Sequence, residues 1–280
     1  MKMMSAAKLR RAQDAINAAR PYSRALESLL KDLLRSSSEE TGKSPMLYGR
    51  PDVADAEQRV LFIIVTSDRG LAGGFNAGLI RFFEARLREH YGEYVKTNRY
   101  GLITLGRRGT DYFVKRNFPI LSQYPGIFAK LEFDTARTVT RDAVERFNHG
   151  DFDHVEIIYN EFKSVVSQKP TAERVLPVLD EAAKSEGGPE DTSIEYIYEP
   201  EPSAILDVLV PKHLETMIWK ALLESNAAEQ GARMTAMDAA TRNAKELVNS
   251  LQLKYNKVRQ AAITKEILEI VGGAEALAKS

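Results

Sequence analysis

The C-terminal part of the chain carries one long helical pattern, and this pattern restricts the possible folds more than any other feature. No proline occurs after Pro211, and small or apolar residues return at alternating steps of four and three, from Leu214 and Ile218 onward to Ala262. Such spacing is typical of a coiled-coil seam. A helix of sixty residues is about 90 Å long. That exceeds the size of a compact domain built from so short a chain, so we expect much of the helix to project.

The N-terminal residues predict a partner for this helix. Residues 1–35 show the same stepping, with the seam predicted at Met1, Ser5, Lys8, Ala12, Ala15, Ala19, Tyr22, Leu26, Leu29 and Leu33. We therefore expect residues 1–35 and 205–280 to form a long antiparallel coiled-coil shaft. Small seam residues bury little apolar area, so the pair should be slender and only modestly stable unless something encloses it.

The middle of the chain has a different period. Strand and helix patterns alternate from residue 58 to about residue 150, which is typical of an α/β layer with right-handed crossovers. We predict an inserted Rossmann-like α/β domain over residues 58–200. The expected strands are 59–67, 99–106, 119–125, 154–162, 170–179 and 194–200, and the expected helices are 77–92, 107–118 and 134–150, the last capped by Asp134.

A glycine-rich turn, "SDRGLAGGFN", follows the first of these strands and opens a helix. Its glycines are Gly70, Gly73 and Gly74. This placement is typical of loops that cradle phosphates. The spacing matches neither G-x-G-x-x-G nor a P-loop, because no Lys-Ser or Lys-Thr follows the glycines. A tight structural turn or a protein contact is the favoured interpretation, and a nucleotide-binding enzyme with a helical dimerisation rod remains the alternative.

Composition excludes several kinds of chemistry. The chain has 39 basic and 39 acidic residues, so no overall charge argues for nucleic acid. It contains no cysteine, which excludes disulfides and thiolate metal sites. Its four histidines lack metal-ligand spacing, and no nucleophile–base set is evident. We expect neither catalytic residues nor a cofactor nor a metal, and no apolar run is long enough to span a membrane.

Local charge is more informative. Lys2, Lys8, Arg10 and Arg11 form a basic group at the start, and Lys254, Lys257, Arg259 and Lys265 form another without any acid between residues 247 and 265. Pairing of the two helices would bring these groups together as a basic collar. The alternative is an ordinary solvated face, but a band of one sign on a projecting rod favours an acidic partner.

Three segments resemble the γ subunit of the F-type ATP synthase. They are the start, "MKMMSAAKLRRAQ…ARPY", the turn "SDRGLAGGFN", and the long C-terminal stretch from "ESNAAEQGARM" to "VGGAEAL". They occur in the family's order, and the last covers more than fifty residues. The resemblance implies a non-catalytic rotor shaft inside a ring of three α and three β subunits. It also implies contacts with the ε subunit and the membrane c-ring, and a place on the cytoplasmic face of the bacterial plasma membrane.

In this family, basic residues of the shaft face acidic loops of the β subunits. The resemblance assigns contacts to Arg259 and Gln260, to Thr264 one turn further, to Arg233 lower on the same helix, and to Lys8 and Arg10 of the N-terminal helix. Proton flow turns the c-ring and the shaft, which drives the three β sites through their states.

Two departures from the family pattern qualify this resemblance. About twenty residues that the family carries before the segment matching Met1 are absent here, so we expect either a misassigned start or a tip that lacks part of its partner from about Ile263 onward. Ala72 stands where a cysteine is common, so no thiol regulation is expected. A coiled-coil scaffold with other partners is the remaining alternative.

Overall fold

The structure is a computed structural model that describes residues 2–36, 44–50, 52–54, 57–178, 199 and 201–278. By the density of its contacts the chain divides into two units, Met1–Thr235 and Ala236–Ser280. The predicted division into a coiled-coil shaft and an α/β domain remains a prediction. The predicted strand at 194–200 lies outside the described residues, apart from the single position 199.

A five-stranded sheet with the order β3-β2-β1-β4-β5 forms the centre of the first unit. The strands are β1 (Val60–Val65), β2 (Tyr100–Leu105), β3 (Ile120–Tyr124), β4 (His154–Ser164) and β5 (Ser167–Leu176). The first four are parallel, and β5 returns antiparallel to β4 as a hairpin. Strand β1 is buried at all six positions, as its continuous apolar run "VLFIIV" predicts for a strand covered on both faces.

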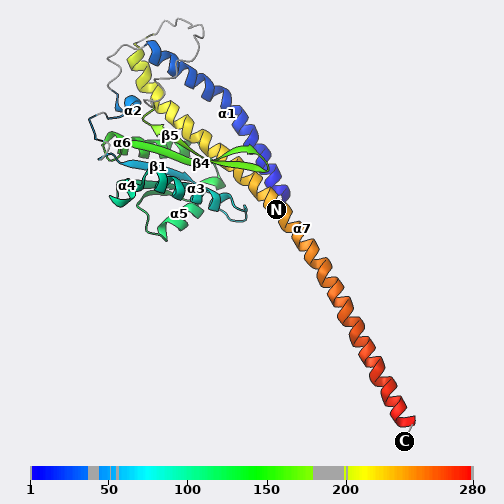
Figure 1. Cartoon of the computed structure of the whole chain (residues 1–280). Coiled ribbons are helices and arrows are strands. Elements are labelled where there is room, and N and C mark those ends of the chain that lie inside the picture. The colour runs from blue at the N-terminus through cyan, green and yellow to red at the C-terminus, as the bar shows by residue number, and fades with distance from the viewer. Residues whose placement is uncertain are drawn as a thin grey trace. The chain divides into compact units, whose positions relative to one another are not determined.

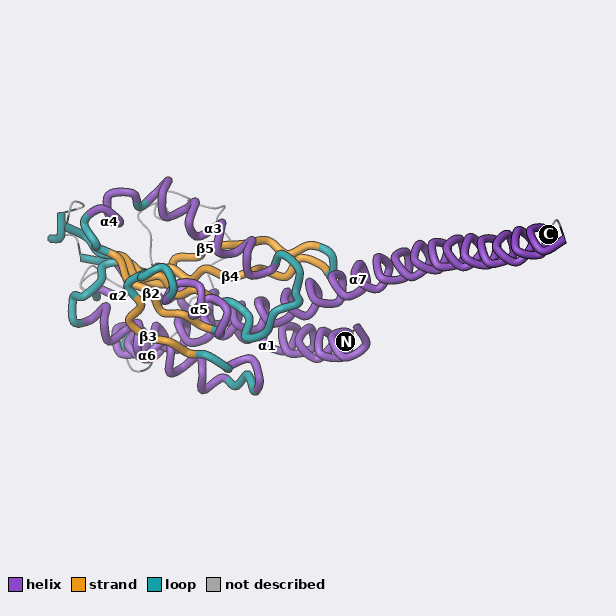
Figure 2. Tube along the Cα trace, turned by 90° about the horizontal axis from the view of Figure 1, so that it is seen from below, coloured by secondary structure: helices purple, strands orange, loops and turns teal. Residues whose placement is uncertain are grey.

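Helices cover both faces of this sheet (Figures 1 and 2). The helices are α1 (Lys2–Ser36), α2 (Pro45–Tyr48), α3 (Phe75–His90), α4 (Gly92–Lys96), α5 (Arg107–Val114), α6 (Phe133–Asn148) and α7 (Pro202–Ala278). Phe62 of β1 packs with Phe83 of α3 and Phe113 of α5 on one face. Leu61 and Ile63 point to the opposite face, where α6, α1 and the start of α7 lie. Alternate residues of β1 therefore pack into two separate hydrophobic cores, one on each face of the sheet.

Helices α1 and α7 pack antiparallel within the first unit. Leu9 and Ile16 of α1 contact Leu223 and Ala227 of α7, whereas Leu33 joins the cluster that holds the first turns of α7. The observed α1 seam steps through Ser5, Leu9, Ala12, Ile16, Ala19, Ser23, Leu26, Leu30 and Leu33. The predicted seam had alternate positions one residue early, with exposed Lys8 and Tyr22 in place of Leu9 and Ser23. At two of these places the larger apolar side chain is the buried one, Leu9 rather than Lys8 and Ile16 rather than Ala15.

Helix α7 begins at Pro202 and continues through Pro211, so it is longer than the pattern after Pro211 predicts. Its side chains from Leu214 to Gln230 are mostly buried, and every side chain from Ala240 to Ala274 is exposed. The predicted seam continued to Ala262, with partner contacts lacking only from about Ile263. That expectation is wrong for this structure, because exposure begins more than twenty residues earlier.

The predicted cap of α6 is also wrong. The helix begins at Phe133, and the capping position is Glu132, whose side chain makes no capping hydrogen bond. Asp134 lies within the first turn, where its carboxylate accepts a hydrogen bond from Arg137 Nη1 at 3.1 Å. A carboxylate at this place still interacts favourably with the helix dipole, which explains why the sequence suggested a cap.

Candidate functional site

The glycine-rich turn between β1 and α3 is held in shape by its own side chains. The amide oxygen of Asn76 accepts a hydrogen bond from Ser67 N at 3.0 Å, and its Nδ2 donates to Ser67 Oγ at 2.7 Å. Two turn residues have positive φ, Gly73 at 58° and Leu71 at 65°. Glycine adopts such values without strain, but a leucine there is uncommon and requires support from its surroundings.

Asp68, which follows β1, binds the segments that follow the parallel strands β2 and β3. Its Oδ1 accepts hydrogen bonds from Arg107 N at 3.0 Å and Gly126 N at 2.6 Å, and its Oδ2 accepts one from Phe128 N at 2.9 Å. Arg107 N is the first amide of α5, a position where α/β folds commonly bind phosphate. Here the chain's own carboxylate takes that position. The sequence did not single out Asp68, although an aspartate directly after a buried strand was visible in "TSDRG".

The turn packs directly on helix α7. Ala72 and Phe75 form a small cluster with Ala228 of α7 and Phe162 of β4. Arg233 of α7 donates from Nη2 to the carbonyl oxygens of Arg69 and Gly70, both at 3.3 Å. The turn is therefore a packed structural element that supports helix α7 within the chain, and the predicted contact with a partner protein remains a prediction.

The hairpin β4–β5 holds the same part of α7. Thr235 Oγ1 donates to the carbonyl oxygen of Val165, at the hairpin tip, at 3.3 Å. A Cβ on Gly231 would lie 3.2 Å from that oxygen, tighter than most real contacts. Gly231 therefore permits a close approach of the hairpin tip and α7. The turn and the hairpin both contact α7 within the last two helical turns of the first unit.

Arg233, predicted to contact a partner, is occupied within the chain. Its Nη2 lies 2.5 Å from Glu229 Oε1, and its side chain is only 12% exposed. Burial raises the pKa of Glu229, while the charge of Arg233 and its hydrogen bond act in the opposite direction. The i,i+4 spacing of Glu229 and Arg233 indicates an ion pair from the sequence alone. The sequence does not indicate that both side chains are buried.

Lys8 borders a cleft of about 320 Å3 next to this pair. The cleft is lined by Lys8, Asp68, Arg69, Arg107, Gly126, Phe128, Ala129, Glu229, Gln230 and Arg233. The part of α7 that faces Lys8 is therefore the one around Glu229. The expectation that helix pairing joins Lys8 to the basic residues from Lys254 to Lys265 is wrong for the pairing seen here, because the antiparallel register places Lys8 beside Glu229. Arg10 is exposed on α1.

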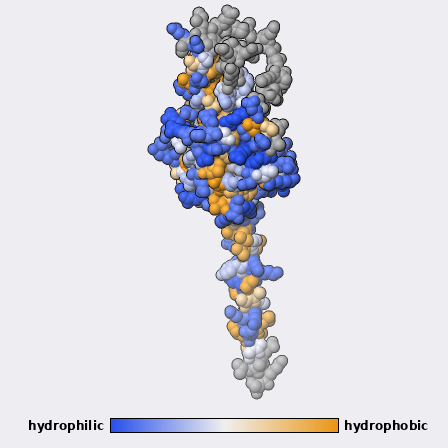
Figure 3. Space-filling model, turned by 90° about the vertical axis from the view of Figure 1, so that its left-hand side faces the viewer, coloured by the Kyte–Doolittle hydropathy of each residue, from blue (hydrophilic) through white to orange (hydrophobic). Residues whose placement is uncertain are grey.

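The other predicted contact residues lie in the second unit. Arg259, Gln260 and Thr264 are all exposed, and Thr264 Oγ1 donates to the carbonyl oxygen of Gln260 at 2.9 Å. Large apolar side chains accompany them, coloured orange along this helix in Figure 3. Those exposed in this unit are Leu247, Val248, Leu251, Leu253, Tyr255, Val258, Ile263, Ile267, Leu268, Ile270 and Val271. A helix with so much exposed apolar surface is typical of one that binds another protein.

Two further features concern the described part of the chain, namely metal sites and membrane-spanning helices. There, no three His, Asp or Glu side chains gather in a way that could hold a metal ion. Among the same residues, no helix combines the length and the apolar character that crossing a membrane requires.

Comparisons with known proteins agree with this arrangement. Residues 1–277 match the family model described as ATP synthase. The ATP synthase gamma chain of Chlorobium phaeobacteroides is 50% identical over 277 residues, which cover 99% of this chain and 91% of that protein. The gamma chain of Chloroherpeton thalassium is 48% identical over 287 residues, covering 100% and 92%.

Solved structures agree as well. The central stalk of the Tetrahymena thermophila mitochondrial ATP synthase matches with a TM-score of 0.61 and 25% identity, covering 86% of this chain and 97% of that one. A chain of the Euglena gracilis mitochondrial ATP synthase has the same fold, with a TM-score of 0.60 at 19% identity over 97% and 95% of the two chains. With half of its residues identical to a gamma chain over nearly its whole length, this chain belongs to the ATP synthase γ-chain family.

Proposed function

We propose that this chain is the rotating central-stalk subunit of an F-type ATP synthase. In this function it turns inside a ring of α and β subunits and couples ion flow through a membrane c-ring to ATP synthesis or hydrolysis at the β subunits. The chain itself supplies no catalytic group. The supporting observation is the C-terminal part of α7, where thirty-five consecutive exposed residues, Ala240–Ala274, carry both apolar and basic side chains.

The exposed surface of that segment fits an enclosing protein partner. Four basic residues are exposed in this segment, Lys254, Lys257, Arg259 and Lys265. No acidic residue occurs between positions 247 and 265. A band of one sign attracts a partner of opposite sign and fixes its register. We infer that Arg259, Gln260 and Thr264 contact acidic loops of the β subunits and that Lys8 and Arg10 of α1 contribute further contacts, whereas Arg233 acts indirectly by holding the glycine turn against α7.

The same function places the first unit next to the ε subunit and the c-ring. The chain is then a peripheral component of a membrane-associated complex, on the cytoplasmic face of the bacterial plasma membrane. The arrangement of Asp68 and Arg233 supports a mechanical purpose for the turn, because both side chains hold loops of the sheet against each other or against α7. Torque applied to α7 would reach the sheet through such contacts.

Replacing both Arg259 and Gln260 with leucine tests the partner contacts. We expect the complex to assemble and the helix to persist, because leucine favours helices and both positions are exposed. Coupling should weaken, measured as the rate of ATP synthesis relative to the rate of proton flow in membrane vesicles.

A matched control carries Lys245→Leu and Gln252→Leu, which place the same two leucines elsewhere on the exposed segment. An unchanged rate of ATP synthesis in a normally assembled Arg259→Leu/Gln260→Leu complex would contradict the contact assigned to these two residues. Failure of the wild-type chain to assemble with α and β subunits would contradict the proposed function itself.

A further inference from the structure

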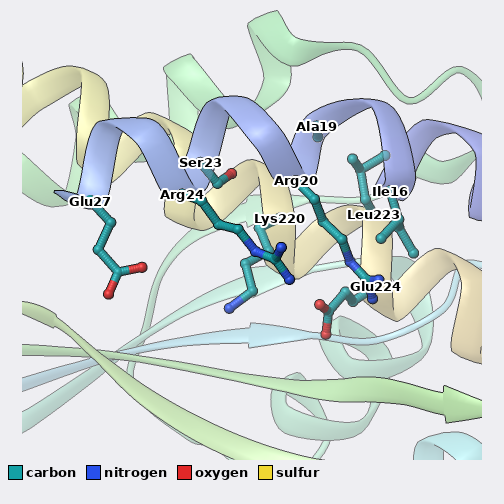
Figure 4. Close-up of a pocket in the computed structure, with 9 residues that line it drawn as sticks. All are labelled: Ile16, Ala19, Arg20, Ser23, Arg24, Glu27, Lys220, Leu223 and Glu224. Atoms are coloured by element: carbon teal, nitrogen blue, oxygen red, sulfur yellow. The ribbon is translucent and has the colours of Figure 1, made fainter. Parts of the chain in front are cut away.

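A second cleft, of about 380 Å3, lies along the junction of α1 and α7 within the first unit. It is distinct from the glycine turn and from the proposed partner contacts. Ile16, Ala19 and Leu223 provide an apolar lining, and charged side chains from both helices complete it (Figure 4). The apolar residues belong to the cluster that joins the two helices, so the cleft is formed by a packed part of the structure rather than by a loop.

Glu224 brings a buried carboxylate to this cleft. Glu224 is only 7% exposed, and its Oε2 has no hydrogen-bond partner. Burial raises the pKa of Glu224, and the nearby Glu161 and Glu173 act in the same direction, whereas Lys220 and Arg20 oppose them. A buried acceptor without a donor costs free energy, so a ligand that supplies a donor would be stabilised here.

Three cationic side chains share the cleft with Glu224. Arg20 and Arg24 are four residues apart, on one face of α1, and neither takes part in any ion pair or hydrogen bond found among the described residues. The third is Lys220, whose Nζ lies 3.6 Å from Glu173 Oε1. In Figure 4 the ends of Arg20, Arg24, Lys220 and Glu224 point toward the same space below α1. The cleft thus presents several donors and one deeply buried acceptor, and its second carboxylate, Glu27, already accepts a hydrogen bond from Lys31 Nζ at 2.8 Å.

Few ligands satisfy both kinds of group at once. Guanidinium groups bind oxyanions in bidentate fashion, and phosphate is a preferred partner. Sulfate and carboxylates carry no proton at neutral pH, so they can accept from the arginines but cannot donate to Glu224. Inorganic phosphate keeps a proton at neutral pH and does both, and so does the protonated fraction of a terminal nucleotide phosphate, whose last pKa is about 6. We propose that this cleft binds a protonated phosphate group, either as inorganic phosphate or as the terminal phosphate of a nucleotide.

Calorimetric titration of the full-length chain at pH 7 tests the proposal, with inorganic phosphate, sulfate and ADP as probes. We expect saturable phosphate binding and sulfate binding weaker by about tenfold or more, since Glu224 can accept a hydrogen bond only from the protonated anion. Arg20→Gln/Arg24→Gln should weaken phosphate binding by about tenfold or more. Glu224→Gln should bring phosphate and sulfate affinities close together, because glutamine can donate to either anion.

A matched double variant, Arg81→Gln/Arg88→Gln, removes two arginines from α3 on the other side of the sheet and should leave phosphate binding unchanged. Circular dichroism and thermal unfolding check that each variant folds. ADP binding that is tighter than phosphate binding and is lost in Arg20→Gln/Arg24→Gln would identify a nucleotide as the source of the phosphate. Three results would overturn the proposal. They are no binding of either phosphate or ADP, equal affinities of the wild type for sulfate and phosphate, and an unchanged phosphate affinity in Arg20→Gln/Arg24→Gln.

Discussion

Two stretches of helix α7 have similar residues and opposite environments. Between Leu214 and Gln230 most side chains are buried against α1, the sheet and the glycine turn. Between Ala240 and Ala274 every side chain is exposed, although the stretch includes eleven large apolar residues. Both stretches are rich in alanine and both follow a helical repeat. In the first stretch the chain provides the surface that the helix packs on, and in the second we infer that other subunits provide it.

This difference shows what a heptad pattern can establish. The pattern predicts a helix that packs on something, but it does not identify the partner. The first stretch finds its partner in the same chain, so its contacts contribute to the stability of the isolated protein. The contacts of the second stretch would contribute only in the complex. Identical substitutions in the two stretches should therefore affect different measurements.

The largest contrast is expected for Ala228→Glu and Ala262→Glu. Ala228 is fully buried beside Ala72 and Phe75, so a glutamate there places an unpaired charge in a packed contact. We expect a loss of about 3–5 kcal/mol in the free energy of unfolding. Ala262 is exposed, so the same change should cost less than about 0.5 kcal/mol in the isolated chain.

Chemical denaturation of the two variants and the wild type provides the measurement. Similar losses in both variants would mean that the second stretch is packed in the isolated chain. A small loss for Ala228→Glu would mean that the glycine turn and α7 separate easily.

Removal of a leucine side chain gives a smaller contrast. Leu214 is fully buried and Leu251 is 55% exposed. Leu214→Ala should lower the free energy of unfolding by about 2–5 kcal/mol through lost burial and a cavity. Leu251→Ala should change it by less than about 0.5 kcal/mol, since alanine also favours the helix. Thermal unfolding of the isolated chain compares the two, and equal effects would contradict the assigned environments.

The third contrast concerns two arginines of α7. Arg233→Gln leaves Glu229 buried without its ion pair and releases the carbonyl oxygens of Arg69 and Gly70. We expect a loss of about 1–3 kcal/mol. Arg259→Gln, at an exposed position, should leave stability within about 0.5 kcal/mol of the wild type. Hydrogen exchange in the turn would show the local effect, and unchanged exchange in Arg233→Gln would exclude Arg233 as its support.

Much of the fold was predictable because local patterns and long-range packing agree. The apolar run of β1, the alternation of strands and helices, and the two long terminal helices all appear as expected. The phase of the α1 seam was predicted wrongly because Lys8 and Tyr22 were counted at the positions that Leu9 and Ser23 occupy. Ranking the alternatives by apolar size would have favoured Leu9 and Ile16, since burial free energy grows with apolar area.

The sites were less predictable, because they depend on residues far apart in the sequence. The resemblance placed Arg233 among the partner contacts, but its guanidinium reaches a turn more than 160 residues earlier in the chain. Asp68 accepts hydrogen bonds from backbone amides that follow β2 and β3, and no local sequence pattern predicts such contacts. The cleft beside Glu224 depends on the register of α1 and α7, which the heptad pattern leaves open by whole turns.

The smallest contrast is a dependence on pH. Burial raises the pKa of Glu224 above its ordinary value of 4.5. The folded chain therefore binds this proton more tightly than the unfolded chain does, and the resulting stability is present below pH 4.5 and is lost as pH rises through the pKa of the folded state. Glu224→Gln keeps a neutral side chain throughout. We expect the variant to be more stable than the wild type by about 1 kcal/mol at pH 8.

At pH 4 the advantage of Glu224→Gln should nearly disappear, because the wild-type carboxyl is then protonated in both states. Glu266→Gln, an exposed change on the second stretch of α7, controls for the loss of one negative charge and should show little difference from the wild type at either pH. Denaturant unfolding at pH 4 and pH 8 measures all three proteins. An advantage of equal size at both pH values would mean that Glu224→Gln acts through packing, and a loss of stability at pH 8 would mean that the carboxylate is already well solvated in the cleft.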